Sequence, residues 1–469
     1  MFDLWIHRVE PYLDLIYAWV WGAPLLILIS GIGIFLTIAL KGLQFRYLGY
    51  ALKLVCKREA SHPEMEGKGD ITHFQSLMTA LAATIGIGNI AGVATALAVG
   101  GMGALFWMWV TALLGMATKY AEALLAVKYR QIDARGEMCG GPMYFIESGL
   151  GWSWLAVAFA IFGAIAALGG GNMLQANSVA DVLHTVFKID PWISGIFVAL
   201  FTGLTLLGGI KSIGKVAGYL VPFMAIFYIA GAGLILLLCY DRIPAALIGV
   251  VTHAFTGQAA FGGFLGSTML IALRVGVSRG LMTSEAGLGT ASIAAAAAKT
   301  DLPGRQALVS MTGSFLATII MCSMTGLVLG VTQVFGQVDA DGNLLNGASM
   351  TVAAFESVIK GGGYIVTIGL VLFAFTTLLG WAYYGEKCVE YLFGVKSVPF
   401  YRVIFILFII PGAVLELDIV WKISDIFNGL MAIPNLIGLL ALSGVVLKET
   451  HTFLNILKAE REAAAHRSF

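Results

Sequence analysis

The residues best suited to bind a ligand lie in the segment 83–101, which reads ATIGIGNIAGVATALAVGG. It is apolar enough for a membrane helix, but a cluster of glycines and Asn89 interrupts it. A helix that opens in its middle presents free N–H groups, which attract an anion, and free C=O groups, which attract a cation. We therefore predict a ligand site at this break. The residues expected to contact the anionic group of the substrate are Gly86, Gly88, Asn89 and Ile90.

The same break can supply oxygen ligands to a small hard cation such as Na⁺. The carbonyl groups that precede the glycines belong to Ala82, Ala83 and Ile85. A distant apolar segment, AFTTLLGWAYYGEK, adds hydroxyl oxygens at Thr376 and Thr377. We predict that these groups together form a Na⁺ site.

Other polar residues interrupt apolar segments as well. Trp381 follows Thr377 by one helical turn, so both lie on one face, where the indole can form a wall for a small apolar side chain. The segment GGGNMLQANS at 169–178 places Gln175 and Asn177 in a further apolar stretch. A second glycine cluster, GGFLGST at 262–268, contains Gly266 and Thr268.

Each pattern also has a plainer interpretation. Glycines in membrane helices often form close packing surfaces, and Asn or Gln side chains often bond to neighbouring helices. A Ser or Thr hydroxyl often bonds to a carbonyl of its own helix. The clustering of glycines around Asn89, and the second cluster at 262–268, favour an opened helix over simple packing.

Acidic residues are absent from the central parts of these segments. Glu122, Glu285 and Glu386 fall near the predicted cytoplasmic ends of apolar stretches. A cationic substrate or a proton relay normally requires an intramembrane carboxylate. We therefore expect a neutral or zwitterionic solute that is coupled to a cation held by oxygen atoms.

The composition places the chain in a membrane. Hydrophobic residues make up 59% of it and charged residues 12%, and the mean hydropathy is +0.88. The net charge of +1 gives no reason to expect a nucleic-acid partner, and the scattered cysteines suggest neither a disulfide framework nor a metal site. No cofactor is expected, and the chain carries no pattern typical of an intramembrane enzyme.

Windows of about 20 apolar residues predict about eleven membrane-spanning helices. They are 18–40, 74–100, 103–127, 153–180, 192–209, 216–240, 258–281, 307–333, 361–384, 402–417 and 425–447. Lys and Arg are concentrated in alternate connections and in the C-terminal tail, which the positive-inside rule places in the cytoplasm with the N-terminus outside. We see no strand pattern. The expected location is the plasma membrane, in a prokaryote the inner membrane.

The spans suggest one all-α membrane domain over residues 1–469. If the span 18–40 is accessory, residues 74–240 and 258–447 form two groups of five spans whose first members are antiparallel and glycine-interrupted. This arrangement is typical of an inverted repeat with its binding site at the breaks. Residues 448–469 are expected to form a charged cytoplasmic tail.

Several long motifs resemble the alanine/glycine:cation symporter family, the sodium:alanine symporters. They are ATIGIGNIAGVATALAVGG, GALFWMWVTALLGMATKYAEALLAVKYR, GGPMYFIESGLG, GGGNMLQANSVAD, GGFLGSTMLIALRVGVSRG, SEAGLGTASIAAAAAKT and FTTLLGWAYYGEKCVEYLFG. The resemblance covers residues from about 15 to 450. It departs at Ile87, where many family members have Thr in a G-T-G-N motif, so Ile87 makes the pocket of this chain more apolar.

The resemblance implies a LeuT-like fold of the amino acid–polyamine–cation superfamily, with two inverted five-helix repeats and one extra N-terminal helix. It implies that the break at 86–92 holds the substrate carboxylate and sodium, that Gly266 and Thr268 contact substrate, that Gln175 and Asn177 line the pocket, and that Thr377 and Trp381 close it. The implied activity is sodium-coupled symport of alanine or glycine by alternating access. Another small neutral solute, H⁺ coupling and, less favoured, a passive channel remain alternatives.

Overall fold

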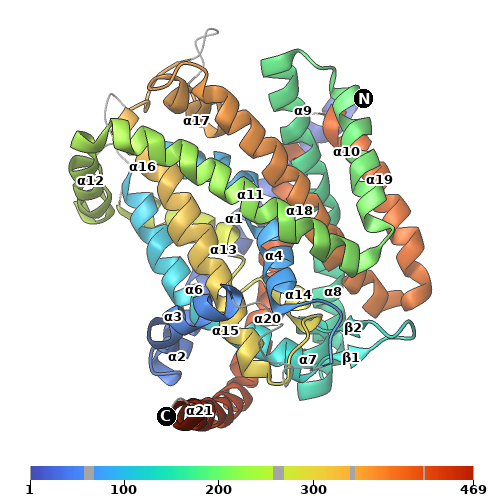
Figure 1. Ribbon diagram of the computed structural model, residues 1–469. Coiled ribbons are helices and arrows are strands. Elements are labelled where there is room, and N and C mark those ends of the chain that lie inside the picture. Colours follow the sequence, from blue (N-terminus) through green and yellow to red (C-terminus); the bar gives the residue numbers. More distant parts are fainter. Residues whose placement is uncertain (1, 57–67, 257–268, 339–343, 416–417, 468–469) are drawn as a thin grey trace.

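The computed structural model describes residues 2–56, 68–256, 269–338, 344–415 and 418–467. Almost all of the described chain is helical (Figure 1). The helices are α1 (Phe2–Val20), α2 (Ala23–Ala39), α3 (Leu43–Cys56), α4 (His73–Thr84), α5 (Ala91–Gly100), α6 (Gly103–Lys128), α7 (Pro142–Leu150), α8 (Ser153–Leu168), α9 (Leu174–Phe187), α10 (Pro191–Leu206), α11 (Gly209–Leu238), α12 (Ile243–Thr256), α13 (Met269–Ser284), α14 (Thr290–Ala296), α15 (Pro303–Ser314), α16 (Ser323–Thr332), α17 (Gly347–Glu356), α18 (Gly362–Phe393), α19 (Val398–Val414), α20 (Asp418–Ala441) and α21 (Ser443–Arg467).

Eight helical stretches within the described residues are long and apolar enough to cross a membrane. They coincide with eight of the predicted spans, which confirms an all-helical membrane protein. Two of them, Ser153–Phe187 and Pro303–Thr332, contain π-helical segments at Gly169–Met173 and Phe315–Cys322. A π-helical segment inserts an extra residue into a helical turn, and such segments are frequent at functional sites.

The three other predicted spans are less regular. The span 74–100 is divided into α4 and α5, and 192–209 corresponds to the short helix α10. The span 258–281 overlaps α13, which begins at Met269. The rest of that span, with the cluster 262–268 and its candidate residues Gly266 and Thr268, lies outside the described residues.

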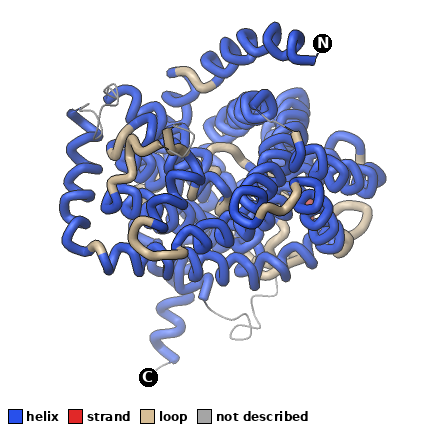
Figure 2. Tube along the Cα trace, turned by 90° about the horizontal axis from the view of Figure 1, so that it is seen from above, coloured by secondary structure: helices blue, strands red, loops and turns tan. Residues whose placement is uncertain are grey.

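One short strand pair accompanies the helices. Residues Gln131–Ile132 (β1) and Met138–Cys139 (β2) form a short antiparallel hairpin between α6 and α7. The sequence gives little sign of it, because each strand is only two residues long and β2 is buried on both positions. The hairpin appears as the small red segment of Figure 2, while α1 lies at the edge of the helix assembly in that view.

The basic connections assemble at one end of the molecule, with α7, α21 and the hairpin (Figure 1). Lys128 pairs with Glu449 at 2.7 Å, and Arg305 pairs with Glu460 at 2.8 Å, so α6 and α15 are both tied to α21. We call this the basic end. It contains the connections that the charge pattern assigns to the cytoplasm.

The helices pack in two groups around the broken helix. In one group α6 packs along α13 and α15; in the other α18 packs along α8 and α9, and α19 packs along α10. The helix α4 contacts α15 of the first group and α18 of the second, and it also packs on α11 and α14. The interrupted helix therefore lies where the two groups meet.

Candidate functional site

The first break lies in the middle of the predicted span 74–100. The helix α4 starts with a capping box in which Thr72 accepts from the N–H of Gln75, and it ends at Thr84. The chain then makes a single 3-10 turn at Ile87–Asn89 before α5 begins. The predicted interruption of this helix is thus confirmed.

Asn89 holds the first break in shape. Its Oδ1 accepts a hydrogen bond from Gly86 N at 3.0 Å, and its Nδ2 donates to Ala317 O at 2.9 Å. Thr325 donates to the carbonyl of Asn89 at 2.9 Å. Ala317 lies in the π-helical segment of the 303–332 span, so the amide joins the broken helix to its neighbour. Asn89 is fully buried, and its side chain does not line the central cavity described below.

A second break lies between α13 and α14. Three residues there have left-handed backbone angles: Glu285 (φ 52°), Gly287 (φ 93°) and Gly289 (φ 81°). Glycine adopts this conformation at little cost, whereas Glu285 is strained in it. This stretch, SEAGLG, follows the predicted span 258–281, because the apolar residues of that span end before it.

Two buried charges on α6 stabilise the second break. Lys119 Nζ donates to Ser284 O at 2.7 Å, at the carbonyl end of α13. Glu122 Oε1 accepts from Gly287 N at 2.9 Å and from Asn435 Nδ2 at 2.7 Å. A cation near a helix C-terminus and an anion near a helix N-terminus are both favourable. The helix α6 therefore places each sign of charge where the broken helix needs it.

The two breaks face each other. The half-helices α5 and α13 pack together, and α4 packs on α14. A Cβ atom built on Gly88 would meet Thr283 Cγ2 at 3.7 Å, an ordinary contact between the first break and the end of α13. Two interrupted helices thus cross the middle of the molecule side by side, with their openings at the same level.

A cavity of about 280 Å³ lies between the two breaks, α18, α20 and the α8–α9 junction. Its walls combine glycines and threonines with two tryptophans and a few charged side chains. Of the candidate site residues, those that line it are Ala83, Gly86, Gly88, Gln175, Thr377 and Trp381. Ile87, which departs from the family motif, also lines the cavity.

The two threonines of α18 point to different places. Thr377 Oγ1 donates to Ala82 O at 3.1 Å and to Phe373 O of its own helix at 2.8 Å. Thr376 Oγ1 bonds to Phe373 O at 3.0 Å and lies 3.4 Å from Met224 Sδ on α11. Only Thr377 therefore brings its hydroxyl to the end of α4. Both hydroxyls also donate to Phe373 O of their own helix, as the plainer interpretation of a Thr in a helix expects.

The two candidate amide side chains of the α8–α9 region, Gln175 and Asn177, also point to different places. Gln175 lines the cavity, donates to Gly170 O at 3.1 Å and has a buried Oε1 atom without a partner within the described residues. Asn177 instead donates to Leu415 O at 3.1 Å, next to α19, as the interhelical interpretation expects. Ile90, the remaining candidate of the first break, is fully buried and lies outside the cavity lining. The sodium candidate Ile85 is likewise buried.

The expectation that acids are absent from the centre is wrong. Glu285 and Asp425 both line the cavity, as does Arg279. The error came from the span boundaries, since Glu285 lies in the second break and Asp425 lies inside α20. Arg279 also lines a neighbouring cavity of about 330 Å³ beside α1, so a water-accessible space adjoins the central one on that side.

Comparisons with known proteins match this architecture. The model of the sodium:alanine symporter family matches residues 6–467. The chain belongs to this family. It is 55% identical over 454 residues to the sodium/alanine symporter AgcS of Methanococcus maripaludis, covering 95% of this chain and 98% of that protein. It is 34% identical over 436 residues to the amino-acid carrier protein AlsT of Bacillus subtilis, covering 92% of this chain and 89% of that protein.

Among solved structures, the family member resembles the crystal structure of MhsT in complex with L-phenylalanine. The TM-score is 0.59 at 15% identity, over 82% of this chain and 93% of that chain. At this identity the likeness concerns the fold alone, which is that of the LeuT-type transporters. The recognition of the family from its motifs is therefore confirmed, and so is the type of fold.

Proposed function

We propose that the protein is a secondary active transporter that moves Na⁺ together with a small neutral amino acid, alanine or glycine, into the cell by alternating access. Membership of the sodium:alanine symporter family supports sodium-coupled amino-acid symport. The observation that carries the proposal is the cavity between two facing helix breaks, because it offers both signs of backbone partial charge in one place.

The substrate carboxylate is proposed to bind at the start of α5. Gly86 and Gly88 leave the backbone accessible from the cavity, and the first N–H groups of a helix have no partners within it. Gln175 and Trp381 line the same cavity. Asn89, which the sequence places among the substrate contacts, is proposed to act by positioning these groups. A cavity of about 280 Å³ suits a small amino acid.

Sodium is proposed to bind at the end of α4, beside the substrate. Ala82 O and Thr377 Oγ1 lie 3.1 Å apart, so both oxygens can point to one cation. Ala83 and Ile85 extend the same chain of carbonyl groups, while Thr376 faces α11. Coupling then follows because each ligand favours the state that the other also favours. H⁺ coupling stays the alternative.

The protein is proposed to span the plasma membrane of a prokaryote with the basic end in the cytoplasm and the N-terminus outside, by the positive-inside rule. Residues 74–240 and 258–447 are proposed as the two inverted repeats, residues 448–469 as the tail, and the bilayer as the surrounding medium.

Uptake of labelled alanine into proteoliposomes tests the proposal. An inward Na⁺ gradient should concentrate alanine in the vesicles, an equal K⁺ gradient should not, and unlabelled glycine should compete. Equilibration without accumulation would indicate a passive channel. Accumulation driven by a pH gradient alone, without Na⁺, would indicate H⁺ coupling.

A further inference from the structure

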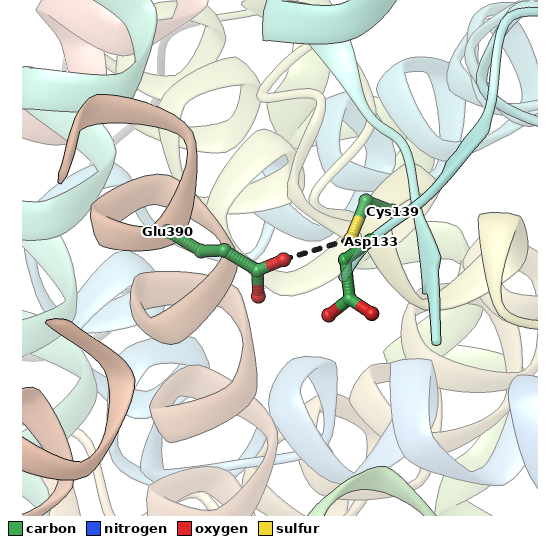
Figure 3. Close-up of side chains that lie close together, drawn as sticks. All are labelled: Asp133, Cys139 and Glu390. Carbon is green, nitrogen blue, oxygen red and sulfur yellow. Dashed lines mark hydrogen bonds between the residues drawn. The ribbon is translucent and has the colours of Figure 1, made fainter. Parts of the chain in front are cut away.

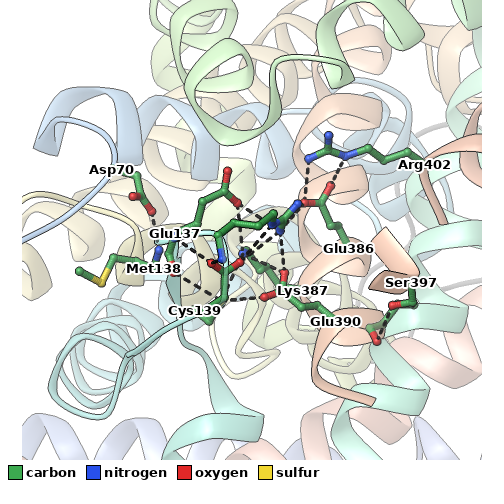
Figure 4. A network of polar contacts seen from close by, with 12 residues as sticks. Asp70, Glu137, Met138, Cys139, Glu386, Lys387, Glu390, Ser397 and Arg402 are labelled. Atoms are coloured by element: carbon green, nitrogen blue, oxygen red, sulfur yellow. Dashed lines mark hydrogen bonds and ion pairs between the residues drawn. The ribbon is translucent and has the colours of Figure 1, made fainter. Parts of the chain in front are cut away.

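A dense polar network lies at the basic end, away from the central cavity (Figure 4). It joins the β1–β2 hairpin to α18 and α19. Its members on the hairpin are Asp133, Arg135, Glu137 and Cys139; those on α18 are Glu386, Lys387 and Glu390; Arg402 completes it from α19. We call these residues the inner latch.

Lys387 forms the centre of the inner latch. Its Nζ lies 3.0 Å from Glu390 Oε2, 3.2 Å from Cys139 Sγ and 3.9 Å from Asp133 Oδ2. The side chain of Lys387 is fully buried. A buried ammonium group is costly unless it is paired and hydrogen-bonded, and here the surrounding acids and thiol supply those partners.

Asp133, Cys139 and Glu390 by themselves resemble a metal site, because their ligand atoms lie within 4.8 Å of one another (Figure 3). The Cys139 thiol instead donates to Glu390 Oε1 at 3.0 Å, and burial raises its pKa to about 12. Lys387 Nζ lies 3.2 Å from Cys139 Sγ and 3.0 Å from Glu390 Oε2, so an ammonium group already pairs with two of these three side chains.

Two arginines extend the network across elements. Arg402 donates from Nε and Nη2 to the carboxylate of Glu386, at 2.7 and 2.9 Å. Arg135 Nη2 lies 3.2 Å from Glu390 Oε2 and 3.2 Å from Glu137 Oε2. Burial opposes ionisation of Asp133, but N–H groups of Glu137 and Arg135 and the charge of Lys387 outweigh it and lower the pKa of this carboxyl. The carboxyl of Asp133 is therefore ionised at neutral pH.

The hairpin also binds the ends of both broken helices. Asp70, two residues before the cap of α4, accepts from Met138 N at 2.7 Å, and Asp70 N donates to Ala297 O at 2.8 Å. Just before the hairpin, Arg130 Nη1 donates to Ala296 O at 2.9 Å and to Ala298 O at 2.7 Å. An unbroken series of polar contacts thus runs from α4 and α14 through the hairpin to α18 and α19.

We propose that the inner latch holds the basic end of the transporter closed, and that it must separate before ligands leave the cavity past α4 and α14. The proposal rests on the proposed function, since it assigns a step of alternating access to this network. Charged groups suit such a step because water can hydrate them when they separate, so both the joined and the separated arrangements are stable.

Cys139 provides the measurement, because it is 2% exposed within the inner latch. In a variant whose other cysteines are replaced by Ser or Ala, the rate of maleimide labelling of Cys139 reports opening. Exposure also lets the thiol ionise more readily, which accelerates labelling further. In the otherwise unchanged protein, Na⁺ with alanine should alter this rate, a response that a purely structural network would not show.

Arg402→Glu should open the inner latch, because it places two carboxylates together. We expect Cys139 to label at least about tenfold faster, in line with the size of a charge-assisted hydrogen-bonded pair, with net alanine uptake lost. Adding Glu386→Arg should restore slow labelling and uptake. Lys128→Glu is the matched control: it breaks a 2.7 Å pair at the same end that joins α6 to α21, so labelling should stay slow.

Unchanged labelling in folded Arg402→Glu, or fast labelling that Glu386→Arg does not reverse, would overturn the inner latch. Failure of the unmodified protein to accumulate alanine with Na⁺ would instead overturn the proposed function. The comparison of labelling rates would still test whether the Arg402–Glu386 pair keeps the inner latch closed.

Discussion

The two helix breaks at the centre of the protein are built by different means. The first, at residues 85–90, is rich in glycine, carries no charge and is fixed by one amide, that of Asn89. The second, at residues 285–289, contains left-handed residues and is fixed by Lys119 and Glu122 from α6. Neutral amides and ionic groups thus stabilise equivalent openings.

The difference suggests a division of roles. A hydrogen bond between neutral groups contributes about 0.5–1.5 kcal/mol, whereas a hydrogen bond to a charged group contributes about 1.5–3 kcal/mol. We expect the second break to be the rigid one and the first to be the adaptable one that surrounds the ligands.

Lys119→Met should destabilise the protein most, by about 3–5 kcal/mol, because it leaves Ser284 O unpaired and removes the buried positive charge beside Glu122 and Glu285. Thermal unfolding in detergent measures the loss. Lys128→Met, at a partly exposed lysine on the same helix, should change the melting temperature little. A stable Lys119→Met protein would show that charge does not fix the second break.

Gly86→Ala should leave the fold intact and damage ligand binding. The new Cβ would lie 2.6 Å from Thr377 Oγ1, so this hydroxyl must move away from Ala82 O. We expect the apparent affinities for alanine and Na⁺ to fall by about a hundredfold, or about 2.7 kcal/mol. Gly31→Ala, where nothing lies within 4 Å of the new atom, is the control. Normal affinity in Gly86→Ala would contradict a close approach at the first break.

Asn89→Ala and Asn435→Ala compare the amides of the two breaks. Each removes buried hydrogen bonds worth about 1–3 kcal/mol when their partners stay unpaired. Asn89→Ala should weaken alanine binding more than it lowers the melting temperature, because Gly86 N loses its acceptor. Asn435→Ala should lower the melting temperature more than it weakens alanine binding. It removes the hydrogen bond from Asn435 to buried Glu122, while Glu122 keeps its bond to Gly287 N and so holds the second break in shape. Equal losses in both assays for both variants would remove the distinction.

Thr377→Val should have the smallest effect of the four, raising the Na⁺ concentration for half-maximal uptake by about tenfold, or about 1.4 kcal/mol. The change keeps the shape of the side chain but removes the hydroxyl next to Ala82 O. Thr376→Val is the matched variant, and its sodium dependence should stay close to that of the unmodified protein because its hydroxyl faces Met224. A reversed order would place the ion on the α11 side of α18.

Much of the site could be predicted from local sequence, but not the direction of each side chain. The glycine cluster around Asn89 predicted the first break, because several glycines gather beside a polar amide there and a second glycine cluster lies at 262–268. Thr376 and Thr377 are neighbours in the sequence, but successive residues of a helix point about 100° apart. The sequence alone therefore does not show that only the Thr377 hydroxyl reaches α4. Gln175 and Asn177 diverge for the same reason.

The second break was missed for a different reason. Its sequence, SEAGLGT, carries a signal in an acid followed by two glycines that are separated by one residue. This stretch lies beyond the apolar span 258–281, which contains a glycine cluster of its own, GGFLGST. The partners that make the break stable, Lys119 and Glu122, lie more than 160 residues away along the chain. No local pattern connects them.

The sequence by itself determined the membrane class, the family, most of the apolar helices and the first break, because hydropathy and glycine content act locally along the chain. The tertiary structure decided which hydroxyl faces the cavity, where the second helix opens, that acids line the centre, and how a hairpin joins the broken helices to α18 and α19. These outcomes depend on contacts between segments that are distant in the sequence. Which side chains become buried, and which charges pair, is decided only when the helices pack together.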